Sequence, residues 1–90
     1  MQKIFVIEDD DSIREMVIYA LNTAGFEAEG FSDGDDIFPA LSERIPALIL
    51  LDIMLPGSDG LSILKRLKQA EHYRQIPVIM LTAKGSELDR

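Results

Sequence analysis

The stretch that decides the fold reads Leu48-Ile49-Leu50-Leu51-Asp52, and a turn signal, Pro56-Gly57, follows shortly after it. A run of branched aliphatic residues bounded by turn residues is typical of a strand buried on both faces, as in a parallel sheet. A carboxylate is costly inside such a sheet, so Asp52 is expected at the strand's carboxyl end, where open α/β sheets bind ligands. The run Ile4–Ile7 has the same character and ends in a second acidic cluster, Glu8–Asp11. Two parallel strands that end in carboxylates predict one shared acidic pocket.

Length and composition exclude several classes of protein. Ninety residues make a single domain, and 47% hydrophobic with 28% charged residues indicates a globular chain. A net charge of −7 argues against nucleic-acid binding by this segment and against adhesion to anionic membranes. The absence of cysteine excludes disulfides and thiolate metal sites. No apolar stretch approaches the roughly 20 residues of a membrane span, and no signal peptide is recognisable, so we expect a cytoplasmic protein.

Strand and helix patterns alternate along the chain, which predicts an α/β fold with right-handed crossovers. Strands are expected at Lys3–Glu8, Phe26–Phe31, Ala47–Asp52 and Pro77–Thr82, and helices at about Ser12–Ala24, Asp33–Arg44 and Gly60–Glu71, with a further helix start at Lys84–Arg90. In the first helix, Ser12 and Glu15 form a capping-box pattern, and apolar residues recur at helical spacing. Pro39 lies inside the second helix, which we therefore expect to start late or to be irregular.

The carboxyl ends of all the predicted strands fall on one edge of a parallel sheet. That edge would carry Glu8, Asp9, Asp52 and Thr82. Like charges at about 4 Å repel by about 4 kcal/mol per pair at an effective dielectric constant near 20, and a hard divalent cation relieves this repulsion. Oxygen ligands suit Mg²⁺, and aspartate can act as a covalent nucleophile that forms an acyl phosphate. The edge therefore predicts a magnesium-dependent phosphoryl site.

These motifs resemble one known family along the whole chain. Glu8-Asp9, then Asp52 with the stretch from Met54 to Gly60, then Leu81-Thr82-Ala83 are similar to the receiver domain of bacterial two-component response regulators. The resemblance implies a flavodoxin-like three-layer sandwich with a parallel sheet of strand order 2-1-3-4. The stretch Thr82–Gly85 looks most like regulators whose output is a winged-helix DNA-binding domain that controls transcription.

The resemblance also implies a role for each matching residue. Asp52 would accept phosphate from a sensor histidine kinase in a phosphorelay. Mg²⁺ would be bound directly by Asp9, through water by Glu8, and further by Asp52 and the backbone carbonyl of Met54. Thr82 would bond a phosphoryl oxygen and act as the switch hydroxyl. The chain would thus be modified on its own carboxylate, and we do not expect an enzyme in the usual sense, although family members can catalyse their own phosphorylation and dephosphorylation.

Departures from the family pattern carry expectations of their own. The family's fifth strand, with its lysine, and its last helix have no match, so residues 1–90 are expected to form a partial receiver domain in which phosphotransfer and switching are impaired. The fourth strand, Val78–Leu81, would then have an uncovered edge that invites self-association.

Two other interpretations remain open. A pseudo-receiver would act as an interaction module that never takes phosphate. An aspartyl phosphatase would need a second aspartate two residues after Asp52, where this chain has Met54. Asp10 and Asp11 are most simply helix caps, and His72 most simply an exposed residue at a helix end.

Overall fold

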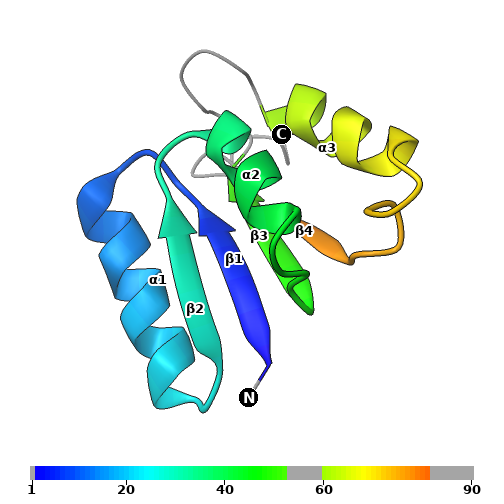
Figure 1. Ribbon diagram of the computed structural model, residues 1–90. Helices are drawn as coiled ribbons and strands as arrows, with labels where there is room; N and C mark the ends of the chain where they lie inside the picture. The colour runs from blue at the N-terminus through cyan, green and yellow to red at the C-terminus, as the bar shows by residue number, and fades with distance from the viewer. Residues whose placement is uncertain (1, 53–59, 82–90) are drawn as a thin grey trace, which may run out of the picture.

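The computed structural model describes residues 2–52 and 60–81, and within them it contains a four-stranded sheet flanked by helices (Figure 1). The elements, in chain order, are β1 (Lys3–Ile7), α1 (Asp11–Thr23), β2 (Glu27–Phe31), a 3₁₀ turn η1 (Gly34–Asp36), α2 (Ile37–Leu41), β3 (Leu48–Asp52), α3 (Gly60–Gln69) and β4 (Val78–Leu81). The predicted alternation of strands and helices is confirmed for the described residues, and the helix start expected at Lys84–Arg90 lies outside them.

All neighbouring strands in the sheet are parallel, and their order is β2-β1-β3-β4. The predicted fold class and strand order are therefore confirmed. Strand β1 is central, with Val6 paired to Gly30 of β2 on one side and to Leu50 of β3 on the other. Because β1 and β3 are adjacent and parallel, the residues that follow their carboxyl ends emerge at the same edge of the sheet.

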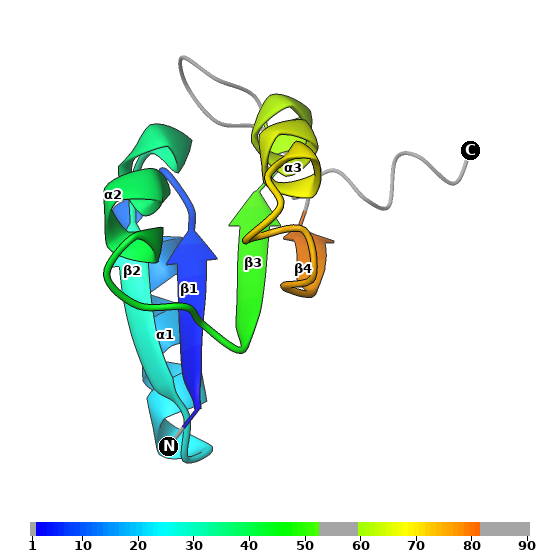
Figure 2. The ribbon, with the colours of Figure 1, turned by 45° about the vertical axis from the view of Figure 1, so that its right-hand side comes forward.

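The hydrophobic core lies on one face of the sheet, under α2 and α3. It joins alternate residues of the central strands to buried residues of these two helices: Phe5, Ile7, Ile49 and Leu51 from the sheet, and Ile37, Ala40, Leu41, Ile63 and Leu67 from the helices. Among the described helices, only α1 lies on the opposite face, over β2 and β1 (Figure 2). The described part of the chain thus has three layers, with one helix on one side and two on the other.

Helix α1 begins earlier than the capping-box pattern predicted, so the assignment of Ser12 as the cap was wrong. Asp10 is the N-cap, and its Oδ1 accepts a hydrogen bond from the backbone N–H of Ile13 at 2.9 Å. Ser12 lies within the first turn. The side chains of Asp10 and Ser12 can both accept a hydrogen bond from a free N–H, and aspartate is at least as good a cap as serine. The sequence alone therefore did not show which of the two residues caps the helix. The simple capping role expected of Asp10 is confirmed.

The second predicted helix, Asp33–Arg44, is irregular, as Pro39 suggested. It consists of the 3₁₀ turn η1 followed by the five residues of α2, which ends at Leu41 and not at Arg44. Pro39 is the third residue of α2, where a backbone N–H would lack a helical partner in any case, so its ring costs no hydrogen bond. The early end of α2 leaves Arg44 in a loop, from which it reaches Glu29 on β2.

Two expectations about which helix residues are buried were wrong. The helical spacing of Leu61, Leu64 and Leu67 predicts that all three face inward, but Leu61 is 58% exposed, and the buried residues of α3 are Gly60, Ile63 and Leu67. Met16, part of the apolar series of α1, is 64% exposed. Both errors have one cause: the helices approach the sheet at an angle that the spacing of apolar residues does not fix.

Candidate functional site

Three carboxylates meet where β1 and β3 end. Glu8 follows the last residue of β1, Asp52 is the last residue of β3, and Asp9 comes next after Glu8. One carboxylate oxygen from each of the three lies within 4.8 Å of the others. Glu8 and Asp52 are buried, with 7% and 6% of their surface exposed, whereas Asp9 is exposed. The structure therefore brings together three of the site residues singled out from the sequence, with one side of the cluster open to solvent.

The proximity of the carboxylates changes the protonation of Glu8. The pKa of Glu8 is raised from 4.5 to about 7, and burial is the largest cause. The negative charge of Asp52 and hydrogen bonds with Asp9 and Asp52 contribute to this rise, while the hydrogen bond from the Asp10 N–H, 3.1 Å from Glu8 Oε2, opposes it. Without a cation, the cluster thus holds a proton near neutral pH, which is the response expected of crowded carboxylates.

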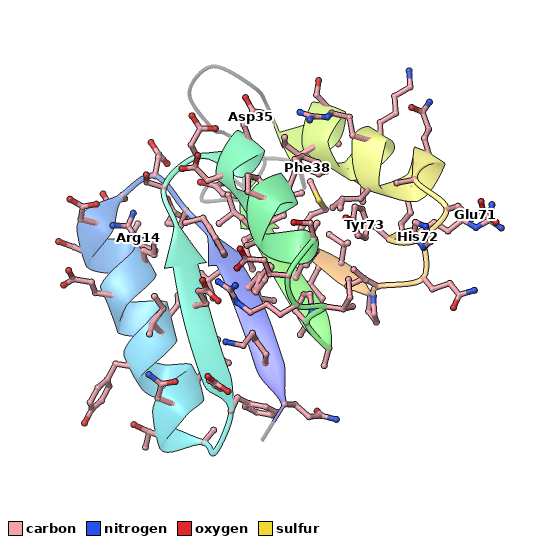
Figure 3. The ribbon with its side chains drawn as sticks, in the orientation of Figure 1. Arg14, Asp35, Phe38, Glu71, His72 and Tyr73 are labelled. Atoms are coloured by element: carbon pink, nitrogen blue, oxygen red, sulfur yellow. The ribbon has the colours of Figure 1, made fainter. Side chains whose placement is uncertain are left out.

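Arg14 fixes the backbone of the cluster and was missed by the sequence analysis. Its Nη1 donates to the backbone carbonyl of Glu8 at 2.8 Å, while the Glu8 N–H donates to the carbonyl of Phe31 at 3.0 Å. The Glu8 backbone is therefore held through its C=O by Arg14 of α1, labelled in Figure 3, and through its N–H by β2. A basic residue in the first turn of a helix opposes the helix dipole, and that unfavourable placement was the available signal.

The other predicted site residues have different outcomes. Met54, Pro56 and Thr82 lie outside the described residues. Gly60 is buried at the start of α3.

The cluster fits a magnesium ion by the chemistry of its donors. All three side chains offer oxygen, and Mg²⁺ takes a small number of carboxylates together with waters and phosphate oxygens. The exposed position of Asp9 leaves that side of the cluster accessible to such ligands.

His72, the chain's single histidine, is not part of the carboxylate cluster. It is exposed in the turn after α3 and, with Tyr73, lines a groove of about 500 Å³ (Figure 3). The remaining lining residues, Leu41 to Ile45, belong to the end of α2 and the loop that enters β3. The groove therefore lies near the amino ends of β3 and β4, away from the three carboxylates.

Within residues 2–52 and 60–81, no helix has the length and apolar character that a membrane crossing requires.

Comparison with known proteins gives one consistent result. The family model described as "Response regulator receiver domain" matches residues 4–90. The phosphate regulon transcriptional regulatory protein PhoB of Escherichia coli strain K12 is 47% identical over 99% of the chain, and the transcriptional regulatory protein BaeR of E. coli O6:H1 is 36% identical over 98%. The chain spans 39% of the length of that PhoB and 35% of that BaeR.

Solved structures agree with the sequence relatives. The N-terminal domain of a response regulator receiver protein from Methanoculleus marisnigri superimposes with a TM-score of 0.89 and 36% identity, covering 93% of this chain and 68% of that one. The chemotaxis response regulator CheY4 of Vibrio cholerae superimposes with a TM-score of 0.88 and 29% identity, covering 100% of this chain and 75% of that one.

Proposed function

Since the chain belongs to the receiver domain family of two-component response regulators, we propose that Asp52 is its phosphoacceptor and that Glu8, Asp9 and Asp52 hold the Mg²⁺ ion that phosphotransfer requires. The observation that carries the proposal is the convergence of these three carboxylates, within 4.8 Å, from the ends of two adjacent parallel strands. No other described group of three histidine, cysteine or acidic side chains comes together in this way.

The donor is a phosphohistidine of a sensor histidine kinase. A carboxylate oxygen of Asp52 attacks the phosphorus, the bond between phosphorus and the histidine nitrogen breaks, and the imidazole keeps the electron pair and takes up a proton. An acyl phosphate on Asp52 results. Mg²⁺, when bound, neutralises charge on the transferred phosphoryl oxygens. Glu8 and Asp9 would hold the ion with Asp52, and the Arg14 contact with the Glu8 carbonyl keeps their backbone in place.

Further roles come from the family resemblance and are proposed on that basis. Thr82 is the switch hydroxyl that bonds the phosphoryl group, and the Met54 carbonyl is a metal ligand. Phosphorylation biases the surface near Asp52 between two states, which an output domain reads. The relatives named as transcriptional regulatory proteins support an output that controls transcription. The winged-helix DNA-binding type of that output, and a cytoplasmic location, are proposed from the sequence and the family resemblance alone.

The test uses beryllium fluoride, a mimic of the aspartyl phosphate, with Mg²⁺. We expect chemical-shift changes at the amides of Glu8, Asp9 and Asp52 when both are added, and none with beryllium fluoride in EDTA. Asp52→Asn is the key variant and should abolish the response, while Asp36→Asn, on an exposed acid of η1, should leave it intact. A folded chain that gives no response would favour a phosphorylation-independent interaction module.

We also propose that the outer edge of β4 can pair with a strand of another copy of the chain. Among the described strands, β4 pairs only with β3, and the open edge of a strand is a template for pairing with another chain. Concentration-dependent sedimentation measures this association.

A further inference from the structure

Arg14 is the only basic residue of helix α1, and its side chain is largely covered (Figure 3). Only 17% of this side chain is exposed, whereas Asp11, its ion-pair partner at 2.5 Å, is 78% exposed. An ion pair at the surface contributes little stability and does not require a covered arginine. The guanidinium also donates from Nη1 to the backbone carbonyl of Glu8 at 2.8 Å. The side chain therefore reaches the carboxyl end of β1.

The carbonyl that Arg14 contacts belongs to the peptide that joins Glu8 to Asp9. Because a peptide unit is planar, turning it changes ψ of Glu8 and φ of Asp9 together, and with them the directions in which both carboxylates leave the backbone. The preceding peptide is held by β2, since the Glu8 N–H donates to the Phe31 carbonyl at 3.0 Å. Arg14 thus holds the peptide on which the relative placement of two proposed metal ligands depends.

Gly30 of β2 leaves the space in which the stem of Arg14 lies. A Cβ atom at Gly30 would be 3.0 Å from Arg14 Cδ and 3.2 Å from Arg14 Cγ, inside the optimum of about 3.5–4.0 Å between carbon atoms. The backbone of Gly30 does not itself call for glycine, because the positive φ among the described glycines occurs at Gly25. The close approach of side chains from α1 therefore accounts for a glycine at this position of the strand.

We propose that Arg14 is a positioning residue for the Mg²⁺ ligands, and that Gly30 admits its side chain. Arg14 holds the peptide between Glu8 and Asp9 in the orientation in which both carboxylates converge with Asp52. This inference rests on the proposed function, since it takes these three carboxylates as the ion's ligands. It adds that the affinity of the site for the ion depends on the contact of α1 with the ends of β1 and β2.

The size of the effect follows from what orienting groups contribute at metal sites. Groups that hold the ligands without touching the metal typically contribute about 10- to 100-fold in affinity. Mg²⁺ demands near-ideal octahedral geometry, so its binding is sensitive to small displacements of the ligands. Arg14 contacts the backbone and not a ligand side chain. We therefore expect its loss to cost about tenfold, the lower end of this range.

The sign of the effect separates positioning from charge. The guanidinium of Arg14 lies beside the backbone of Glu8, and a positive charge near the site repels a cation. If Arg14 acted through its charge alone, its removal should tighten Mg²⁺ binding. If it positions the ligands, its removal should weaken binding. Arg14→Met keeps an unbranched side chain without charge or donor, so the two explanations predict opposite results for this variant.

The first test is a Mg²⁺ titration of the folded chain, followed by the amide signal of Asp9. Arg14→Met should raise the Kd for Mg²⁺ about tenfold. Arg14→Lys keeps the charge and a donor that can reach the carbonyl, so it should raise the Kd less. Arg44→Met, the matched control, removes an arginine that pairs with Glu29 and should leave the Kd unchanged. Circular dichroism checks that each variant is folded.

Gly30→Ala tests the space for Arg14 while the arginine stays in place. It should raise the Kd for Mg²⁺ by less than Arg14→Met does, because the stem of Arg14 has to give by only a few tenths of an ångström. Gly25→Ala is the matched control. A Cβ atom at residue 25 meets nothing within 4 Å, and its strain comes from the φ of +99°, so the Kd should equal that of the wild type.

A second measurement needs no metal. In EDTA, Arg14→Met should shift the NMR signals of the Glu8 carbonyl carbon and the Asp9 amide nitrogen, which belong to the same peptide, and Arg44→Met should shift neither. Unchanged signals in Arg14→Met overturn the inference.

The titration separates this inference from the function on which it rests. A wild-type chain that gives no Mg²⁺ response at Glu8, Asp9 and Asp52 overturns the proposed function and the inference with it. A wild-type chain that binds Mg²⁺ no more tightly than Arg14→Met overturns the inference alone.

Discussion

Glu8 and Asp52 are the buried charged side chains in the described part of the chain, and they lie against one another at the ends of adjacent strands β1 and β3. Two carboxylates in this position cannot both ionise without cost. The fold therefore maintains an unfavourable charge arrangement at its most buried polar position. Protein stability and occupancy of the site by a cation are consequently linked.

The first prediction concerns pH. Glu8 has a pKa of about 7 when folded and near 4.5 when unfolded, so the folded state holds the proton more tightly between these values. In Mg²⁺-free buffer, the free energy of unfolding should be largest at about pH 5 and should fall by roughly 3 kcal/mol as the pH rises past 7. Urea denaturation in EDTA across this range measures the slope.

Two controls accompany this measurement. Glu8→Gln should remove most of the slope between pH 5 and 7, because glutamine does not titrate. Added Mg²⁺ should restore stability to the wild type at the alkaline end, since it stabilises the ionised cluster. A free energy of unfolding that rises over this pH range would contradict the assignment.

The second prediction concerns the ion pair between Arg44 and Glu29. Arg44 donates to both carboxylate oxygens of Glu29, and these hydrogen bonds hold the pKa of Glu29 below its usual value. The pair therefore stabilises the fold above pH 4.5, and its contribution is lost as the pH falls through the lowered pKa. Glu29→Gln should lower the midpoint of urea unfolding at neutral pH. At acidic pH, its midpoint should approach that of the wild type. Glu43→Gln, which removes Arg44's exposed partner, should have a smaller effect.

The third prediction concerns the outer edge of β2. Asn22 Oδ1 accepts from the Ala28 N–H at 3.1 Å, which occupies a donor that an edge strand otherwise presents to other chains. Asn22→Ala should destabilise the fold by about 1 kcal/mol and should accelerate hydrogen exchange at the Ala28 amide. Thr23→Ala, at the neighbouring position of the same helix, should leave that amide protected.

The fourth prediction concerns the contact of α1 with the sheet. A Cβ atom at Gly30 would lie 2.6 Å from Ile18 Cδ1 and 3.0 Å from Arg14 Cδ. The nearer atom is the end of a flexible side chain, so Gly30→Ala should cost about 1 kcal/mol, at the low end of overpacking effects. Thermal unfolding should show that adding Ile18→Val to the Gly30→Ala variant recovers part of the lost stability. Gly25→Ala is the control, because it is destabilised by the φ of +99° at residue 25 and not by a contact with Ile18. Adding Ile18→Val to that variant should recover none of its lost stability.

The central strands and their carboxylates could be predicted from the sequence because burial on both faces leaves a distinct pattern. The run that ends at Asp52 has no polar interruption, and its predicted strand differs from β3 by one residue. The strand order came from the family resemblance, since apolar runs do not say which strands are neighbours. Once β1 and β3 are known to be adjacent, the meeting of Glu8 with Asp52 follows.

The surroundings of the site could not be predicted in the same way. Arg14 reaches the Glu8 carbonyl because α1 lies over β2 with Ile18 toward Gly30, and no local pattern encodes that angle. The apolar series through Met16 indicated a helix correctly but implied a buried side that the structure does not show. Tertiary contacts, which set the rotation of a helix, are the missing information in both cases.

The central position of β1 has a consequence for partial unfolding. Because Glu8 and Asp52 lie at the ends of the adjacent strands β1 and β3, the outer described strand β4 can detach while these two residues remain in register. Detachment of β2, in contrast, removes the Phe31 carbonyl that accepts from the Glu8 N–H. Opening of β4 should therefore leave cation affinity nearly unchanged, so amide exchange in β4 should respond little to Mg²⁺. Exchange in β1, β2 and β3 should slow as the Mg²⁺ concentration rises.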